Sequence, residues 1–197
     1  MAIRSLKNGT FSRSLLIGNT AYDPPDFDLI STVTVGSSGA SSVTFSSIPG
    51  TYTDLQIIAI AKTTSATNTF DRSRVQFNSD TASNYSLHEL YSVNGSAYST
   101  ATANSSNMYS FNVPYGSSSY TNIFGAGIIE ILDYANTNKY KTMQTLGGVD
   151  SNSTSVDYGT NFVGGNWRST SAITSITFNP PAGSWAQYSS FSLYGIN

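Results

Sequence analysis

The chain contains one histidine, His88, and no cysteine, so few residue types are present that could carry out chemistry. A Ser-His-Asp triad needs an activated serine beside its histidine, and the sequence has no G-x-S-x-G turn that would present one. Zinc sites usually combine several histidine and cysteine ligands, which one histidine cannot supply. The sequence therefore predicts a structural or surface role for His88.

Carboxylate pairs could still hydrolyse a glycosidic bond, and Glu89 and Glu130 are available for such chemistry. Glu130 interrupts the apolar run IIEIL, so it is a candidate for a buried acid with a raised pKa. The alternative, which we favour, is an ion pair between Glu130 and Lys139 or Lys141 on the adjacent strand. A carboxylate-based glycosidase or depolymerase is accordingly the most remote of the functions considered.

The segment DPPDFD brings Asp23, Asp26 and Asp28 close together, and their oxygens could surround Ca²⁺. The segment lacks the spacing and the central glycine of an EF-hand loop, so we expect a stiff, polyproline-like linker with solvated acids. We predict no catalytic residue, no metal site and no cofactor.

Composition limits the class of protein further. Of the 197 residues only 10% are charged and 39% are hydrophobic, and Ser, Thr, Asn, Gly and Tyr fill the difference. An ordinary soluble domain is about 25% charged. Such a polar but weakly ionic surface suits an extracellular or virion surface, a glycan-binding face, or an exterior that is buried against other copies of the chain.

Charge and hydropathy exclude two kinds of partner. The net charge is -2, and the nine basic residues are scattered rather than clustered, which argues against electrostatic binding to nucleic acid. No stretch approaches the ~20 apolar residues that cross a bilayer, and no apolar core of a signal peptide follows the first methionine. We therefore expect synthesis in a cytoplasm and no membrane insertion.

Short alternating segments separated by polar turns predict an all-β fold, an antiparallel jelly-roll-like sandwich in a single domain over residues 29–197. Segments 31–35 and 42–48 are expected to form a hairpin, with SVTF (42–45) and SITF (175–178) starting equivalent hairpins at the two ends of the sandwich. Residues 94–107 are predicted to form an exposed loop. In GAGIIEILDYA, Gly125 and Gly127 indicate a bulge or a close backbone approach.

The segment YTDLQIIAIAK is apolar on both faces at its centre, because Leu55, Ile57, Ala59 and Ala61 alternate with Ile58 and Ile60. We expect it to be covered on one side by a second sheet and on the other by a neighbouring chain or by the N-terminal segment.

Aromatic residues in polar, loop-like settings are candidates for contact with a receptor or a glycan, since exposed tyrosine and tryptophan make adaptable contact surfaces. The alternative is that they fold over the ends of the sandwich. The candidates are Tyr98, Tyr115, Tyr120, Tyr158 and Trp167.

The first 28 residues lack strand periodicity and are predicted to form an extended docking arm with a proline-containing hinge. Basic residues precede the first acid, Asp23, and could meet an acidic surface, while apolar residues could anchor in a partner. The alternative is a disordered terminus. The predicted docking residues are Arg4, Lys7, Phe11, Arg13, Leu15, Leu16 and Ile17.

Several phrases together resemble small virion-associated structural proteins of tailed bacteriophages, of the type found in phages of cyanobacteria and other aquatic bacteria. These phrases are SRSLLIGNTAY, SSVTFSSIPGTYTDLQI, FNSDTASNYSLHEL, FGAGIIEILDYANTNKYKT, STSAITSITF and YSSFSLYGIN. The resemblance implies a non-enzymatic component on the virion surface, either capsid decoration or part of a tail or fibre.

The leading hypothesis is thus a virion structural protein that docks through its arm to capsid or tail proteins and forms a homo-oligomer. The alternative is a tail-fibre module that binds a host receptor or surface glycan. Capsid and tail placement stay open at this point.

Overall fold

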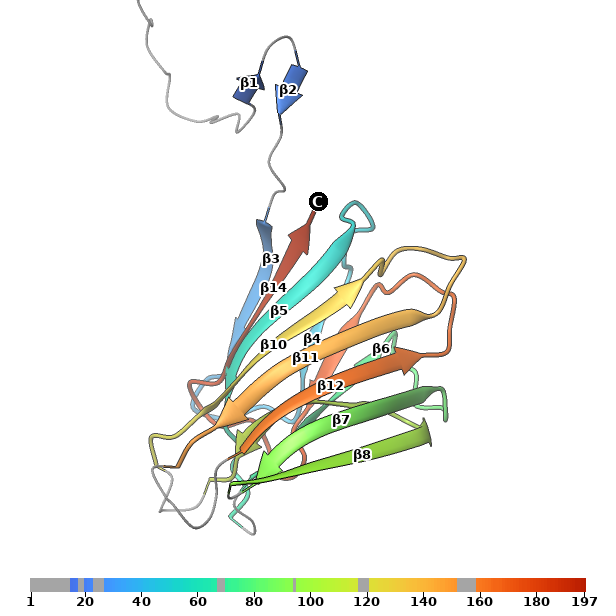
Figure 1. Ribbon diagram of the computed structural model, residues 1–197. Coiled ribbons are helices and arrows are strands. Elements are labelled where there is room, and N and C mark those ends of the chain that lie inside the picture. The colour runs from blue at the N-terminus through green and yellow to red at the C-terminus, as the bar shows by residue number, and fades with distance from the viewer. Residues whose placement is uncertain are drawn as a thin grey trace, which may run out of the picture.

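The structure is a computed structural model that describes residues 15–17, 20–22, 27–66, 70–93, 95–116, 121–151 and 159–197. The described residues form strands and no helix. Two antiparallel sheets pack face to face, as Figure 1 shows, and this confirms the prediction of an all-β sandwich. The jelly-roll character of the sandwich stays a prediction.

The large sheet has eight strands in the order β3-β14-β5-β10-β11-β12-β7-β8, all antiparallel to their neighbours. In that order the strands are β3 (Phe27–Thr34), β14 (Ser190–Ile196), β5 (Asp54–Ala61), β10 (Gly125–Leu132), β11 (Lys141–Val149), β12 (Gly159–Trp167), β7 (Tyr85–Val93) and β8 (Ser96–Ser105).

The small sheet has four strands in the order β4-β13-β6-β9 and covers one face of the large sheet. These strands are β4 (Val43–Phe45), β13 (Ile176–Asn179), β6 (Phe70–Phe77) and β9 (Met108–Pro114). A separate two-stranded sheet near the N-terminus pairs β1 (Leu15–Ile17) with β2 (Thr20–Tyr22).

The core lies between the two sheets and follows directly from residue alternation. Leu55, Ile57, Ala59 and Ala61 are buried, and the intervening Ile58 and Ile60 lie on the opposite face and are exposed. The predicted division of this strand into two faces is confirmed, whereas the predicted cover of its second face stays a prediction. From the small sheet, Val75 and Phe77 point into the same core and are fully buried. Because side chains alternate between faces, every strand of the large sheet also presents an outward set of residues.

Strand β9 crosses the large sheet at close range, and glycines make this approach sterically possible. A Cβ atom on Gly127 or on Gly147 would overlap the side chain of Phe111, and one on Gly125 would overlap the carbonyl oxygen of Asn112. The prediction that Gly125 and Gly127 mark a close backbone approach is confirmed, and Gly147 on β11 adds to it.

The predicted hairpin between segments 31–35 and 42–48 is wrong, because β3 pairs with β14 while β4 pairs with β13. The segments SVTF and SITF do not lie at opposite ends of the sandwich either. They are neighbours in the small sheet, with Val43 opposite Phe178 and Phe45 opposite Ile176. Their similarity therefore reflects two paired strands that share one core-facing pattern.

Two further expectations need correction. Residues 96–105, predicted as part of an exposed loop, form the edge strand β8, because their backbone pairs with β7 despite the lack of apolar side chains. The last two residues of the predicted arm, Phe27 and Asp28, begin β3 and belong to the large sheet.

Candidate functional site: the outward face of the large sheet

A continuous row of apolar side chains crosses the outward face of the large sheet. Strand register places these residues directly opposite one another on successive strands, in the order Ile58, Ile128, Leu146, Phe162 and Leu90. Their exposed fractions run from 39% for Ile58 to 61% for Leu146. Solvent-facing strands of an antiparallel sheet ordinarily carry polar residues, so this row is the feature of the face that requires a functional explanation.

A second row beside the first extends the apolar surface, with Ile60 opposite Ala126. On the other side of the first row the residues are polar: Gln56 donates a hydrogen bond from Nε2 to Oε1 of Glu130 at 3.1 Å, and Gln144 lies opposite Glu130 on the next strand. The apolar rows are thus bordered by a polar row, as in the core and rim of a protein interface.

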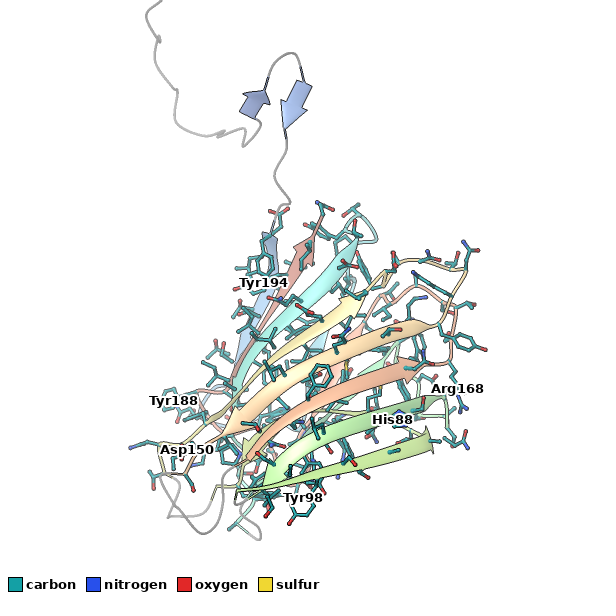
Figure 2. The ribbon with its side chains drawn as sticks, viewed as in Figure 1. His88, Tyr98, Asp150, Arg168, Tyr188 and Tyr194 are labelled. Atoms are coloured by element: carbon teal, nitrogen blue, oxygen red, sulfur yellow. The ribbon has the colours of Figure 1, made fainter. Side chains whose placement is uncertain are left out.

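The outward face is almost free of charge. Within the described strands of the large sheet, the acidic and histidine side chains at outward positions are Asp54, Glu130 and His88, and no lysine or arginine occupies an outward position. Figure 2 shows His88 on β7 and Tyr194 near the opposite edge of the sheet. Such a face offers little for a charged ligand and much for an apolar surface.

A hollow of about 550 Å³ lies at the β12, β7 and β8 end of this face. Its floor is Gly164, where an added Cβ atom would meet nothing within 4 Å. Phe162, two residues earlier on the same strand, forms one wall and is 47% exposed. The other residues that line the hollow are His88, Glu89, Leu90, Ser99, Thr100 and Ala101. A projecting ring and an open depression therefore stand side by side on β12.

A second group of residues, which sequence reasoning missed, lies between the sheets at the β7 end. Glu89 is 3% exposed and accepts hydrogen bonds from Nε of Arg72, at 3.0 and 3.1 Å, and from Nδ2 of Asn161 at 3.1 Å. The same Nδ2 donates to the carbonyl oxygen of Ser110 at 2.6 Å. Burial lowers the pKa of Arg72, but the hydrogen bond and charge of Glu89 outweigh it, so the net shift is upward.

Aromatic rings cover this ion pair on its solvent side. The Arg72 guanidinium lies 4.3 Å from the ring centre of Tyr91, and Tyr91 stacks on Tyr98 with ring centres 5.4 Å apart. Tyr98 is 49% exposed, as its predicted contact role requires. The stack therefore presents a tyrosine ring to solvent above a fixed cation, and cation–π attraction holds the middle ring in place.

The other predicted contact residues behave differently. Trp167 is 3% exposed and Tyr115 is 2% exposed, so their predicted placement in exposed loops is wrong. Trp167 ends β12, stacks on Tyr85 and donates a hydrogen bond from its indole nitrogen to Asp80 at 2.7 Å. Polar neighbours in the sequence misled the prediction, because the ring itself faces the core. Tyr120 and Tyr158 lie outside the described residues.

The expected ion pair of Glu130 is also wrong. Lys139 pairs with Asp133, and Lys141 is buried, donating hydrogen bonds to the backbone carbonyl oxygens of Asn136, Lys139 and Thr170.

Glu130 faces outwards, whereas Glu89 faces the core of the same sheet. These two carboxylates therefore cannot flank one glycosidic bond. His88 lies on the surface, in agreement with its prediction.

The docking residues Arg4, Lys7, Phe11 and Arg13 lie outside the described residues, as do Asp23 and Asp26 of the acidic cluster. Leu15, Leu16 and Ile17 form β1, of which only the backbone pairing with β2 is described.

Among the described residues no group of three or more His, Asp or Glu side chains is placed to hold a metal ion. Nor does the described part of the chain contain a helix long and apolar enough to cross a membrane.

Comparison with protein-family models, with curated proteins and with solved structures found no match for this chain.

Proposed function

We propose that this chain is a non-enzymatic structural protein of a bacteriophage virion, located on the particle exterior and docked to the capsid or tail by its N-terminal arm. The observation that carries the proposal is the apolar row from Ile58 to Leu90 on the outward face of a stable sandwich. A surface of this kind is suited to packing against another protein. The sequence resemblance supplies the virion setting.

The N-terminal arm and the sheet face have separate roles in this proposal. The arm provides one attachment and the sheet face provides another, and linked attachments raise overall affinity through effective concentration. A subunit held in this way stays on the particle even where each contact alone is weak. This arrangement suits capsid decoration or an appendage equally well.

The test uses the phage that encodes the chain. Removal of residues 1–22 is expected to leave a folded sandwich, since β3 begins at Phe27, but to abolish incorporation into particles. Circular dichroism checks the fold, and immunoblotting of purified particles checks incorporation. Electron microscopy with labelled antibody then places the full-length chain over the head or at the tail. Normal incorporation of the truncated chain, or no label on particles, contradicts the proposal.

A second candidate function, receptor or glycan binding at a tail fibre, is favoured by one observation, the stack of Tyr98 on Tyr91 above Arg72. Sugar rings pack on exposed aromatic faces, and the tyrosine hydroxyls can hydrogen-bond to them.

A glycan array probed with the full-length chain tests this function. Binding that is lost in Tyr98→Ala and kept in Tyr140→Ala supports it, because Tyr140 is similarly exposed, at 53%, but lies in the turn before β11. Equal binding by both variants, or none by the parent chain, rejects it.

A further inference from the structure

We infer that the hairpin of β1 and β2 packs on the outward face of the large sheet of its own chain, where the apolar residues of β1 cover Ile58 and Ile128. The inference goes beyond the proposed function, because it concerns the free chain before it joins a particle. Residues 23–26, which join the hairpin to β3, lie outside the described residues. The place of the hairpin on the sandwich therefore follows from stability, reach and charge.

The stability of the hairpin is the first argument. In the described part of the chain, β1 pairs only with β2, through three residue pairs, as a separate two-stranded sheet. An isolated two-stranded hairpin is at best marginally stable in water, and it needs an apolar surface to pack on. All three residues of β1 are apolar, and the exposed row on the outward face is a surface of the kind required.

The reach of the hairpin is the second argument. Phe27 begins β3, and its ring centre lies 4.9 Å from that of Tyr194. Register places Ile58 two strands across from Phe27 and four residues further along the strand, with Ile128 on the next strand. By strand spacing and residue rise, Ile128 lies roughly 20 Å from Phe27. The chain from Phe27 back to Thr20 spans roughly 23 Å when extended, so the turn of the hairpin reaches Ile128.

Charge complementarity is the third argument. The arm carries Arg4, Lys7 and Arg13, and no acid accompanies them in the first 22 residues. The outward carboxylates of the described strands of the large sheet are Asp54 and Glu130, and no outward lysine or arginine lies beside them. The basic side chains of the sandwich bind other groups there: Lys62, Arg72, Arg74, Lys139, Lys141 and Arg168. The arm can therefore supply the positive charge that this face lacks.

The short link between the hairpin and β3 selects the face of the same chain. A short linker holds a tethered group at an effective concentration of about millimolar, which a second copy in a dilute sample does not match. In a clause that rests on the proposed function, attachment of the arm to a particle then removes the hairpin and exposes the face for its own contact.

A single thiol on the face tests the cover, because the chain has no cysteine. Ile128→Cys is placed in three full-length backgrounds: the parent arm, an arm with Leu15→Ser and Ile17→Ser, and a matched control arm with Ser12→Ala and Ser14→Ala. The rate of reaction with a maleimide is measured. The Leu15→Ser, Ile17→Ser arm should react at least ~10-fold faster than the other two, since a cover that is open less than a tenth of the time slows the reaction by about that factor.

Tyr188→Cys is the control for the reagent. Tyr188 is 71% exposed and follows the backbone of Val35, beyond the far end of β3 from the arm. Its thiol should react at one rate in all three backgrounds. Circular dichroism checks that each variant keeps the sandwich.

Cross-linking with a short bismaleimide identifies which copy supplies the hairpin. Ile17→Cys with Ile128→Cys should give a cross-linked monomer. Ile17→Cys with Ala101→Cys should give none, because Ala101 on β8 lies roughly 34 Å from Phe27, out of reach of the hairpin of the same chain.

Several results would overturn the inference. Equal maleimide rates at position 128 in all three backgrounds show that the hairpin does not cover the face. Cross-linked dimers from the Ile128→Cys pair assign the cover to a second copy, and cross-linking no greater than that of the Ala101→Cys pair removes the contact altogether. These measurements use the free chain, so they are independent of incorporation into particles, whose failure would reject the proposed function instead.

Discussion

Nε of Arg72 on β6 lies 3.0 and 3.1 Å from the two carboxylate oxygens of Glu89 on β7, and this contact joins the small sheet to the large sheet. The Glu89 side chain is fully buried, whereas the Arg72 side chain is 21% exposed. The carboxylate is therefore shielded from water, and hydrogen bonds from protein groups replace those that water would donate to it. The pair fixes the end of the sandwich on which the Tyr91 and Tyr98 rings stack.

Replacing Arg72 with methionine should lower the free energy of unfolding by about 3 kcal/mol, because the buried Glu89 carboxylate then lacks its cation. Replacing both residues, as in Arg72→Met with Glu89→Leu, should recover most of the loss, since no buried charge remains without a partner. Urea unfolding monitored by circular dichroism measures both changes. A double variant that is no more stable than the single one would show that the charge of Glu89 is not the source of the cost.

Gly127→Ala and Gly147→Ala should each destabilise the fold by about 1–3 kcal/mol, the usual cost of overpacking, because the new methyl group overlaps Phe111. Gly164→Ala is the matched control on a neighbouring strand of the same sheet, and its methyl group meets nothing within 4 Å. Thermal unfolding compares the three variants. Equal stability of all three would contradict the close approach of β9 to the large sheet.

Burial raises the pKa of Tyr85 to about 12, with the nearby charge of Asp80 acting in the same direction and a hydrogen bond to the backbone of Phe77 opposing it. The ordinary tyrosine pKa is about 10. Above pH 10 the unfolded chain releases this proton while the folded chain keeps it. The contribution of Tyr85 to stability is therefore complete below about pH 10 and is lost as the pH rises towards 12.

Tyr85→Phe isolates this effect from the other tyrosines. At pH 8 the variant should be less stable by about 1 kcal/mol, because the phenol hydroxyl makes hydrogen bonds with the backbone of Phe77 and Asp80. The difference between the two proteins should shrink as the pH rises from 10 to 12. Urea unfolding at several pH values measures it, and a difference that is constant over this range would show that Tyr85 titrates normally.

Alternation in the sequence predicted much of the fold. The two apolar sets of the segment that forms β5 alternate in the sequence and lie on opposite faces of the strand. These predictions succeed because the side chains of a strand alternate wherever the strand lies. The same alternation predicts a cover for the outer face of β5, where Ile58 and Ile60 are exposed, by a neighbouring chain or by the N-terminal segment. That cover stays a prediction.

Strand pairing could not be predicted from the alternation of apolar and polar residues. Proximity in the sequence predicts a hairpin between segments 31–35 and 42–48, yet β3 pairs with β14 from the far end of the chain, and β4 pairs with β13. Such pairs depend on which strands a shared core brings together, and local sequence carries little information on that choice.

The sequence by itself determined the fold class and the two faces of the strands. At Gly125 and Gly127 it left a bulge or a close backbone approach open, and the structure has the close approach. Only the tertiary structure decided which outward residues form one surface, because Ile58, Ile128, Leu146, Phe162 and Leu90 come from five separate strands. It also buried Trp167, whose polar neighbours in the sequence suggested exposure, and it placed the buried Glu89 beside Arg72. Period-two alternation is a local property, whereas register between distant strands is set by packing of the whole core.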